Sequence, residues 1–429
     1  MSNNIVIITG AGFSAPAKLP LQNEILREMS AHPANSIMNF EVEIESVKFL
    51  HAYIEVAIYL LAKYSDRKYN DLYTKYDLLN EAFSVYKIVT RQHKDSTDII
   101  QKILEEDEVL FAINEDKYYS ELIILKEDIR KMLELSNLEI NLEDIFTLFD
   151  KSILSHEYLG EYSYGRIDRI RQSIMRLFIY YFGRKSQDCS LQIADYVEFI
   201  NFLKKYKDGV SIITTNWDTL LERYCKSYNI SYDLSLNDTY FKFDDARKNS
   251  VTKKKSNKLI KIHGSINWLN CLNCGNISIF EKSSNRNYLL DDNSKEICLS
   301  CGAESQNNDI LLQPEIITPT MIKSIDSQLY KNLWRAAGNE LANADKLIFI
   351  GYSFPVADYE FRNLLQKSVS HSTSIDVVLH TNDNPNKIPK RQKHLKSLLP
   401  EKRYRDAFNQ NEIRFFYDGF KQYFENYSN

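Results

Sequence analysis

A short run of apolar, mostly β-branched residues opens the chain and leads straight into a glycine turn. Residues Ile5–Thr9 read IVIIT and are followed by GAGFSA over residues 10–15. A continuous apolar run of this length is typical of a strand that is buried on both faces, as in parallel sheets. After Pro20, apolar residues recur at helical spacing as far as Met29. The segment therefore predicts a strand, a glycine loop and a helix, the first half of a β-α-β unit.

Four further apolar runs of the same kind follow much later in the chain. They are Val210–Thr214, Leu259–Ile262, Lys346–Ile350 and Ile375–Leu379. Together with the first run they predict a Rossmann-like α/β fold, a doubly wound and mostly parallel sheet. Ligands of such sheets bind just beyond the carboxyl ends of the strands, and the unusual polar clusters of this sequence fall there.

The intervening region, about residues 36–205, has helical periodicity. Its apolar faces are marked by residues 44–61, 122–132 and 167–177. Its tyrosines are interpreted as helix-packing residues, with a stacking surface as the alternative. We expect an inserted helical domain over 36–205, an α/β core formed by 1–35 and 206–429, and a smaller module over 265–310 within that core.

Composition and charge limit the class of protein. The 429 residues are 44% hydrophobic, and 54 Lys and Arg face 58 Asp and Glu, for a net charge of −4. This composition predicts a folded chain of two or three domains that is not drawn as a whole to nucleic acid or anionic lipid. Residues Lys253–Lys255 are interpreted as a solvated loop, with nucleic-acid contact as the alternative. The absence of a basic leader and of a long apolar run predicts a cytoplasmic protein without membrane attachment.

Four of the six cysteines form two C-x-x-C pairs, Cys271 with Cys274 and Cys298 with Cys301. This spacing is typical of two zinc knuckles that close one tetrahedral site. Four thiolates leave no open position for water or substrate, so the predicted Zn²⁺ is structural. The remaining Cys189 and Cys225 are interpreted as packing residues.

Polar residues follow two of the predicted strands directly. Residues 214–218 read TTNWD after the strand that begins at Val210, and His263 with Gly264 follows the strand that begins at Leu259. A helix N-cap accounts for Asn216 or for Asp218, but not for both. Gly264 is interpreted as leaving room for a ligand beside His263, whose ordinary pKa near 6.5 suits a general base.

Four motifs in this order resemble the sirtuin superfamily: GAGFSAPAKLP (10–20), TTNWD (214–218), KIHGSINW (261–268) and GYS (351–353), with the cysteine pairs between the last two. The resemblance covers about residues 1–30 and 205–420. Residues 19–23, LPLQN, lack the acid and the arginine that follow the first loop in the deacylase branch. The Phe-Ser after GAG, the inserted helices and TTNWD are instead similar to the bacterial sirtuin-like NAD hydrolases of anti-phage defence.

The resemblance implies an NAD glycohydrolase that releases nicotinamide and ADP-ribose. Asn216 would orient water or the ribose hydroxyls, and His263 would take a proton. The residues that would bind the rest of NAD are Gly10, Ala11, Gly12, Phe13 and Ser14 at the phosphates, Asp218 at the carboxamide, Gly351 and Ser353 at the phosphates or adenosine ribose, and Asn382 near the adenine.

Two other functions remain open at this stage: an NAD-dependent protein deacylase, and a nucleotide-sensing module that does not turn NAD over. A sensor needs neither a base nor a water-orienting amide, so Asn216 and His263 favour an enzyme. An uncontrolled NAD hydrolase would deplete its own cell. We therefore expect control by homo-oligomerisation through the helical insertion, or by a separately encoded ring ATPase or phage-sensing partner.

Overall fold

The computed structural model describes residues 4–20, 142–159, 163–188, 194–206, 209–236, 241–243, 257–280, 297–303, 312–323, 325, 327–379 and 400–428. The chain forms two compact units, one of Met1–Gln22 with Phe178–Asn429 and the other of Asn23–Leu177. The first unit holds the sheets and every candidate site residue that is described.

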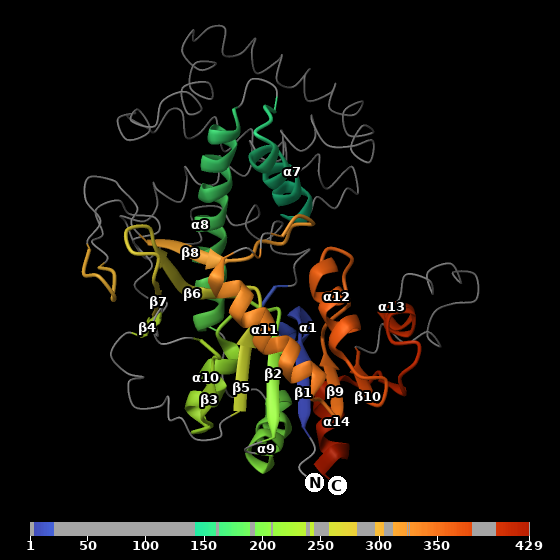
Figure 1. The fold of residues 1–429 in the computed structure, drawn as a ribbon. Helices are drawn as coiled ribbons and strands as arrows, with labels where there is room; N and C mark the ends of the chain where they lie inside the picture. Colours follow the sequence, from blue (N-terminus) through green and yellow to red (C-terminus); the bar gives the residue numbers. More distant parts are fainter. Residues whose placement is uncertain are drawn as a thin grey trace, which may run out of the picture. The chain divides into compact units, whose positions relative to one another are not determined.

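The core of the first unit is a seven-stranded sheet in the order β11-β10-β9-β1-β2-β5-β3 (Figure 1). Every neighbouring pair in it is parallel. The strands are β1 (Ile5–Thr9), β2 (Val210–Thr214), β3 (Tyr232–Asp233), β5 (Asn257–Lys261), β9 (Lys346–Ile350), β10 (Ser374–Val378) and β11 (Ile413–Phe416). The predicted α/β class is confirmed, and the five predicted strands are present to within two residues at each end.

The strand order reverses direction at β1. The chain places β2, β5 and β3 on one side of β1, and then crosses to place β9, β10 and β11 on the other side. In register, Thr9 pairs with Thr214 of β2 and with Ile350 of β9. The loops that leave these three strands therefore begin at one level, beside the point where doubly wound sheets bind ligands.

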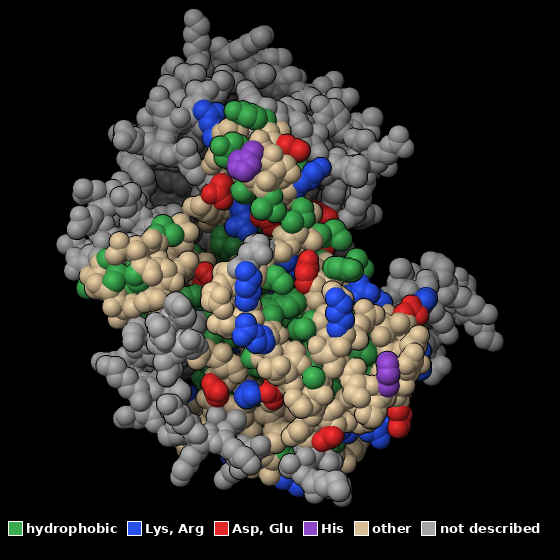
Figure 2. Space-filling view, viewed as in Figure 1, with side chains coloured by type: hydrophobic (Ala, Val, Ile, Leu, Met, Phe, Trp, Pro, Cys, Tyr) green, Lys and Arg blue, Asp and Glu red, His purple; other side chains and the backbone are tan. Residues whose placement is uncertain are grey.

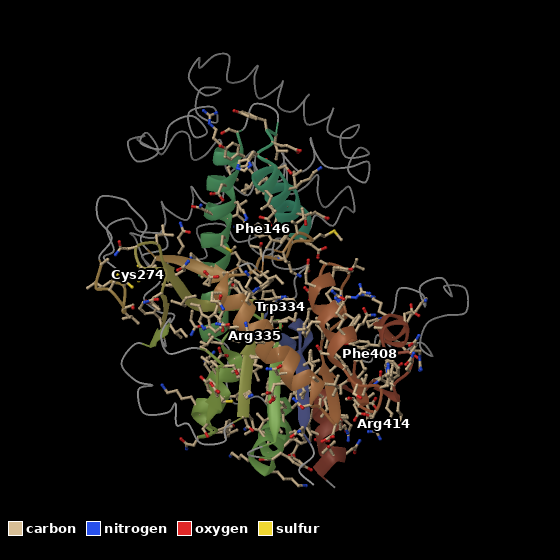
Figure 3. All side chains as sticks on the ribbon, in the orientation of Figure 1. Phe146, Cys274, Trp334, Arg335, Phe408 and Arg414 are labelled. Atoms are coloured by element: carbon tan, nitrogen blue, oxygen red, sulfur yellow. The ribbon has the colours of Figure 1, made fainter. Side chains whose placement is uncertain are left out.

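Helices cover the sheet, as the complete burial of β1 and β2 requires. In Figure 1, α11 crosses in front of β5, β2 and β1. Trp334 of α11, labelled in Figure 3, donates its indole N–H to the carbonyl of Ile262 (3.1 Å). The helices of this unit are α1 (Ala11–Ser14), α9 (Val197–Lys205), α10 (Leu220–Ser227), α11 (Gln328–Ala342), α12 (Tyr359–Ser368), α13 (Pro400–Ala407) and α14 (Gly419–Ser428), with short 3-10 turns at Ala15–Ala17 and Ala194–Tyr196.

Sequence patterning did not reveal a second sheet, whose longest strand follows β5 directly. Its order is β4-β7-β6-β8, from β4 (Phe241–Phe243), β6 (Gly264–Cys271), β7 (Ile277–Ile279) and β8 (Leu312–Ile316). Strand β6 runs antiparallel to β7 and β8. Only Ile262 and His263 separate β5 from β6, so His263 occupies the junction of the two sheets.

The helical region is described in part, by α7 (Leu142–Ser155) and α8 (Tyr164–Asp188). Ile167, Ile170 and Ile174 of α8 are buried, which confirms that part of the predicted apolar face. Asp150 of α7 pairs with Arg171 of α8 at 2.5 Å. The predicted faces at 44–61 and 122–132, the run Lys253–Lys255 and Cys189 lie outside the described residues. Within those residues, no helix has the length and apolar character needed to cross a membrane.

Helix α9 belongs to the unit that holds the sheet, although the boundary expected between residues 205 and 206 assigns it to the insertion. Its Phe199 and Phe202 lie in the main hydrophobic core and contact Phe424 of α14, with ring centroids 5.4 and 5.0 Å apart. The chain's return to the core therefore begins before β2.

Candidate active site

The loop after β1 and the turn after β9 touch backbone to backbone. The amide of Gly12 donates to the carbonyl of Gly351 (2.9 Å). Gly351 has φ +60°, and a Cβ placed on it would lie 2.2 Å from the amide nitrogen of Phe13. No side chain fits at such a distance, and positive φ strains every residue except glycine. The GYS turn therefore requires its glycine in order to seat the first loop.

The amides of the first loop are largely engaged within the protein. The Gly10 amide donates to the Ile350 carbonyl (3.1 Å), and the Phe13 amide donates to the Gly10 carbonyl (2.9 Å). With the Gly12 bond, three N–H groups expected to face a pyrophosphate are already satisfied. The Phe13 ring is fully buried in the core, 5.2 Å from the ring of Tyr196 between centroids. Its side chain is therefore a packing residue, while Ala11 of the same loop is exposed.

Asn216 reaches back from the loop after β2 to the first loop. Its Nδ2 donates to the carbonyl of Gly10 (2.9 Å) and to Oγ of Ser14 (3.1 Å). Its own amide is held by Oγ1 of Thr214 (3.1 Å). The side chain is partly exposed, and among the described residues its Oδ1 accepts no hydrogen bond. The carboxamide is thus fixed by its nitrogen and offers its oxygen as an acceptor.

Asp218 completes this network from a buried position. Its Oδ2 accepts from Oγ of Ser14 (2.8 Å), and its Oδ1 accepts from the amide of Leu220 (2.9 Å) at the start of α10. Burial raises the pKa of this carboxyl, and the nearby positive charge of Lys261 opposes the shift. Asp218 therefore holds both Ser14 and the amide of Leu220, the first residue of α10, whereas Asn216 contacts the first loop instead.

A buried ion pair that sequence analysis missed lies beneath Asp218. Nζ of Lys261 bonds Oε1 of Glu222 (2.9 Å) and also donates to the backbone carbonyl of Asp218. Both side chains are almost completely buried. The signal was present in the sequence, since Lys261 interrupts an apolar strand that has no other reason to carry a charge.

His263 is 4% exposed, and its Nε2 has no hydrogen-bond partner among the residues that the structure describes. Burial lowers its pKa to about 4; the negative charge of Asp358 opposes that shift, the positive charge of Lys323 adds to it, and a hydrogen bond with the backbone of Thr215 opposes it. The ordinary value near 6.5 expected from sequence is therefore corrected. At neutral pH the imidazole is uncharged and able to accept a proton.

The backbone requires a glycine directly after His263. Its φ is +76°, and a Cβ placed on it would lie 2.3 Å from the carbonyl oxygen of Glu315 on β8. The glycine thus allows β6 to approach β8 closely, directly after the histidine.

A second buried charge cluster, also missed from sequence, faces His263. Oδ1 of Asp358 lies 3.8 Å from Nε2 of His263. The same carboxylate accepts hydrogen bonds from Nζ of Lys323 and from the hydroxyl of Tyr352 (3.0 Å). An aspartate just before a helix usually serves as its N-cap, but Asp358 makes no cap bond to α12.

Ser353, a predicted binding residue, lies apart from these contacts. Ser353 is exposed, and its carbonyl accepts from Arg403 (3.0 Å). Asn382 lies outside the described residues.

The four cysteines of the C-x-x-C pairs come together. Their Sγ atoms all lie within 4.8 Å of one another, with Cys271 to Cys301 at 3.9 Å and Cys274 to Cys298 at 3.7 Å. A tetrahedron with zinc–sulfur bonds of about 2.3 Å has edges of about 3.8 Å, whereas a disulfide would need about 2.05 Å. The donor set therefore fits Zn²⁺. Cys274 marks this lobe in Figure 3, and hydrophobic side chains lie on its surface in Figure 2, from Leu272, Ile297 and Leu299.

We predict about one zinc per chain in metal analysis of the purified protein. The double variant Cys271→Ser with Cys274→Ser should lose the metal and lower the free energy of unfolding by roughly 4 kcal/mol, because a structural zinc contributes folding free energy directly. Cys225→Ser, at a buried position on α10, is the matched control and should keep its zinc. Zinc-free protein with unchanged melting would contradict the assignment.

Residues 210–401 match the family model described as SIR2-like domain. The matched range contains Asn216, His263, Gly351 and the four cysteines, and it begins with β2. The match covers less than half of the chain and does not include the first loop, residues 10–14, which contributes to the same site. No curated protein matches the chain.

Solved structures with some likeness include a Sir2 homolog–NAD complex, with 12% identity, 94% of this chain and 90% of that chain covered, and a TM-score of 0.33. A structure on sirtuin substrate affinity has 12% identity, coverage of 99% and 94%, and a TM-score of 0.35. A Sir2 protein bound to a propionylated peptide has 15% identity, coverage of 59% and 78%, and a TM-score of 0.32. Likenesses this low say nothing about the activity of the present chain.

Proposed function

We propose that the protein is an NAD glycohydrolase, which converts NAD and water to nicotinamide, ADP-ribose and a proton. The observation that carries this proposal is one hydrogen-bonded cluster at the carboxyl ends of β1 and β2. In it, Asn216, Ser14 and Asp218 hold one another. His263 stands next to it, bonded to the backbone of Thr215. This is a positioned amide beside a neutral base, in a SIR2-like domain.

Asn216 is the positioning group of the proposed reaction. The Nδ2 of Asn216 donates to Gly10 and Ser14, so the position of its Oδ1 is fixed. In the proposed reaction, Oδ1 accepts a hydrogen bond from water or a ribose hydroxyl. A fixed acceptor removes the orientational freedom of the attacking group before the reaction begins.

His263 is the proposed base. Nε2 takes the proton from the attacking water or from a ribose hydroxyl as the bond between the ribose carbon and the nicotinamide nitrogen breaks. The electron pair of that bond stays with nicotinamide, and the water oxygen ends on the ribose carbon. The uncharged state of His263 at neutral pH supports this role, because only the neutral imidazole accepts a proton.

The remaining contacts to NAD are proposed from the sequence resemblance. The loop Gly10–Ser14, the turn at Gly351 and Ser353, and Asn382 would bind the phosphates and adenosine. Ala11 is the exposed residue of that loop. The carboxylate oxygens of Asp218 each retain a lone pair beyond their bonds to Ser14 and Leu220, so a contact with the nicotinamide carboxamide is compatible with the network.

The biological role rests on the resemblance alone. We propose that the sirtuin-like core, residues 1–35 and 206–429, depletes NAD in anti-phage defence. The inserted domain, 36–205, would form a homo-oligomer that controls it, or would receive a ring ATPase or phage-sensing partner. The zinc of module 265–310 would have a structural role only.

Nicotinamide release from NAD, measured with and without an acylated lysine peptide, tests the proposed activity. We expect equal nicotinamide release with and without the peptide, because water and not an acyl group is the acceptor. Release that requires the peptide would identify a deacylase. Tight NAD binding with no release would identify a sensor.

A further inference from the structure

Asp358 directs its carboxylate away from its own helix and toward His263. It stands immediately before α12, where an aspartate ordinarily caps the helix, yet its side chain makes no cap bond. Its oxygens instead bond Tyr352 and Lys323, and Oδ1 lies 3.8 Å from Nε2 of His263. One carboxylate therefore joins the turn after β9, the segment after β8 and the histidine at the junction of the two sheets.

The partner charge is buried with it. The Lys323 side chain is 2% exposed and that of Asp358 is 11% exposed, and Nζ of Lys323 also donates to the carbonyl of Ala357 (2.8 Å). A buried ion pair is weak evidence for stability, because apolar residues of similar volume often serve as well. Apolar residues cannot place a negative charge beside Nε2 of His263, which has no hydrogen-bond partner within the described part of the chain.

We propose that Asp358 is a positioning residue that stabilises the imidazolium formed when His263 takes a proton, and that Lys323 holds its carboxylate in place. At 3.8 Å the neutral imidazole makes no hydrogen bond to Asp358. When Nε2 gains a proton, the ring acquires a positive charge 3.8 Å from the carboxylate, and the two opposite charges attract each other. No bond to carbon is made or broken in this step. The effect of Asp358 on catalysis rests on the proposed function, whereas its effect on the protonation of His263 does not.

The two charges should act on His263 in opposite directions. Among the described residues, Asp358 raises the pKa of His263 and Lys323 lowers it, while Tyr352 acts only through its bond to Asp358. Asp358→Asn should therefore lower the pKa of His263 below its value of about 4 in the parent protein. Lys323→Met should raise it by about 1 unit or more, since a carboxylate alone then faces the ring.

The test is a titration of the histidine side chains in the full chain, labelled with ¹³C and ¹⁵N at histidine and observed by NMR. There are 8 histidines, and His263→Gln assigns the signal. Asp376→Asn is the matched control: Asp376 is a buried acid on β10, paired with Lys346 and Arg414, and its loss should leave the His263 midpoint unchanged. The double variant Asp358→Asn with Lys323→Met leaves no unpaired buried charge, and so preserves a measurement if Asp358→Asn does not fold.

Opposite shifts in the two single variants, or an upward shift in Lys323→Met that the double variant cancels, support the proposal. Equal midpoints in all variants, or shifts in one direction, overturn it whether or not the protein cleaves NAD. If nicotinamide release is observed, Asp358→Asn should also lower kcat by about 10-fold or more with a smaller change in KM. A structural role would lower the amount of folded protein instead, and would leave kcat per folded molecule unchanged.

Discussion

Replacing His263 with alanine is expected to lower the rate of nicotinamide release by ~10²–10⁴-fold, the usual contribution of a general base. Asn216→Ala should cause a loss of similar size, because it removes the fixed acceptor and also the bonds to Gly10 and Ser14. Single-turnover assays with folded variants measure both effects. His371→Ala, at an exposed histidine far along the chain, is the matched control and should keep the parent rate.

The rate of the same reaction should depend on pH in a way that reflects the burial of His263. The neutral imidazole is the active form, and its pKa is lowered to about 4. The rate should therefore stay level as the pH falls through 6.5 and should drop only as it approaches 4. Retention of more than about a tenth of the parent rate in His263→Ala, or an acid limb near 6.5, would contradict the assigned role.

Gly351→Ala is expected to destabilise the fold by more than about 3 kcal/mol. The added Cβ would lie 2.2 Å from the Phe13 nitrogen and 2.3 Å from the Gly12 carbonyl carbon, so the first loop would have to move away from the turn at Gly351. Backbone atoms cannot rotate aside as a side chain can. Denaturant unfolding of the purified variant measures the loss.

Gly419→Ala separates the two causes of strain at Gly351. Gly419 has φ +79°, with nothing within 4 Å of an added Cβ, so its variant carries the cost of positive φ alone, about 1 kcal/mol. Equal losses in the two variants would show that the close approach of the loops contributes nothing. A much larger loss of unfolding free energy at Gly351 supports the close contact between the first loop and the GYS turn.

The main sheet could be predicted because its central strands are buried on both faces. Strands β1, β2 and β9 each appear as a run in which apolar residues predominate, since all their positions except Lys346 at the start of β9 are buried. Strand β11 is only partly buried, and β3 has two residues, so neither leaves such a run. The second sheet was missed because β6 mixes polar and apolar residues. The strand is nevertheless buried, because its polar side chains form hydrogen bonds.

The site could be predicted where a residue follows a strand end, as Asn216, Asp218 and His263 do. The two buried ion pairs could not, because each joins residues far apart in sequence: Lys261 with Glu222 across 39 positions, and Lys323 with Asp358 across 35. Sequence distance hides which charges meet in the interior. The backbone requirement for glycine at position 264 was missed for the same reason, because the neighbour that requires it lies on β8.

Product analysis of a single turnover is the most direct test of the proposal that the protein hydrolyses NAD. The purified full chain is mixed in excess over NAD, without any peptide, and the products are separated by chromatography and weighed by mass spectrometry. An excess of protein detects even slow turnover in a controlled enzyme. The account predicts nicotinamide and linear ADP-ribose in equal amounts. Cyclic ADP-ribose as the main product, or intact NAD recovered from the protein after prolonged incubation, would contradict it.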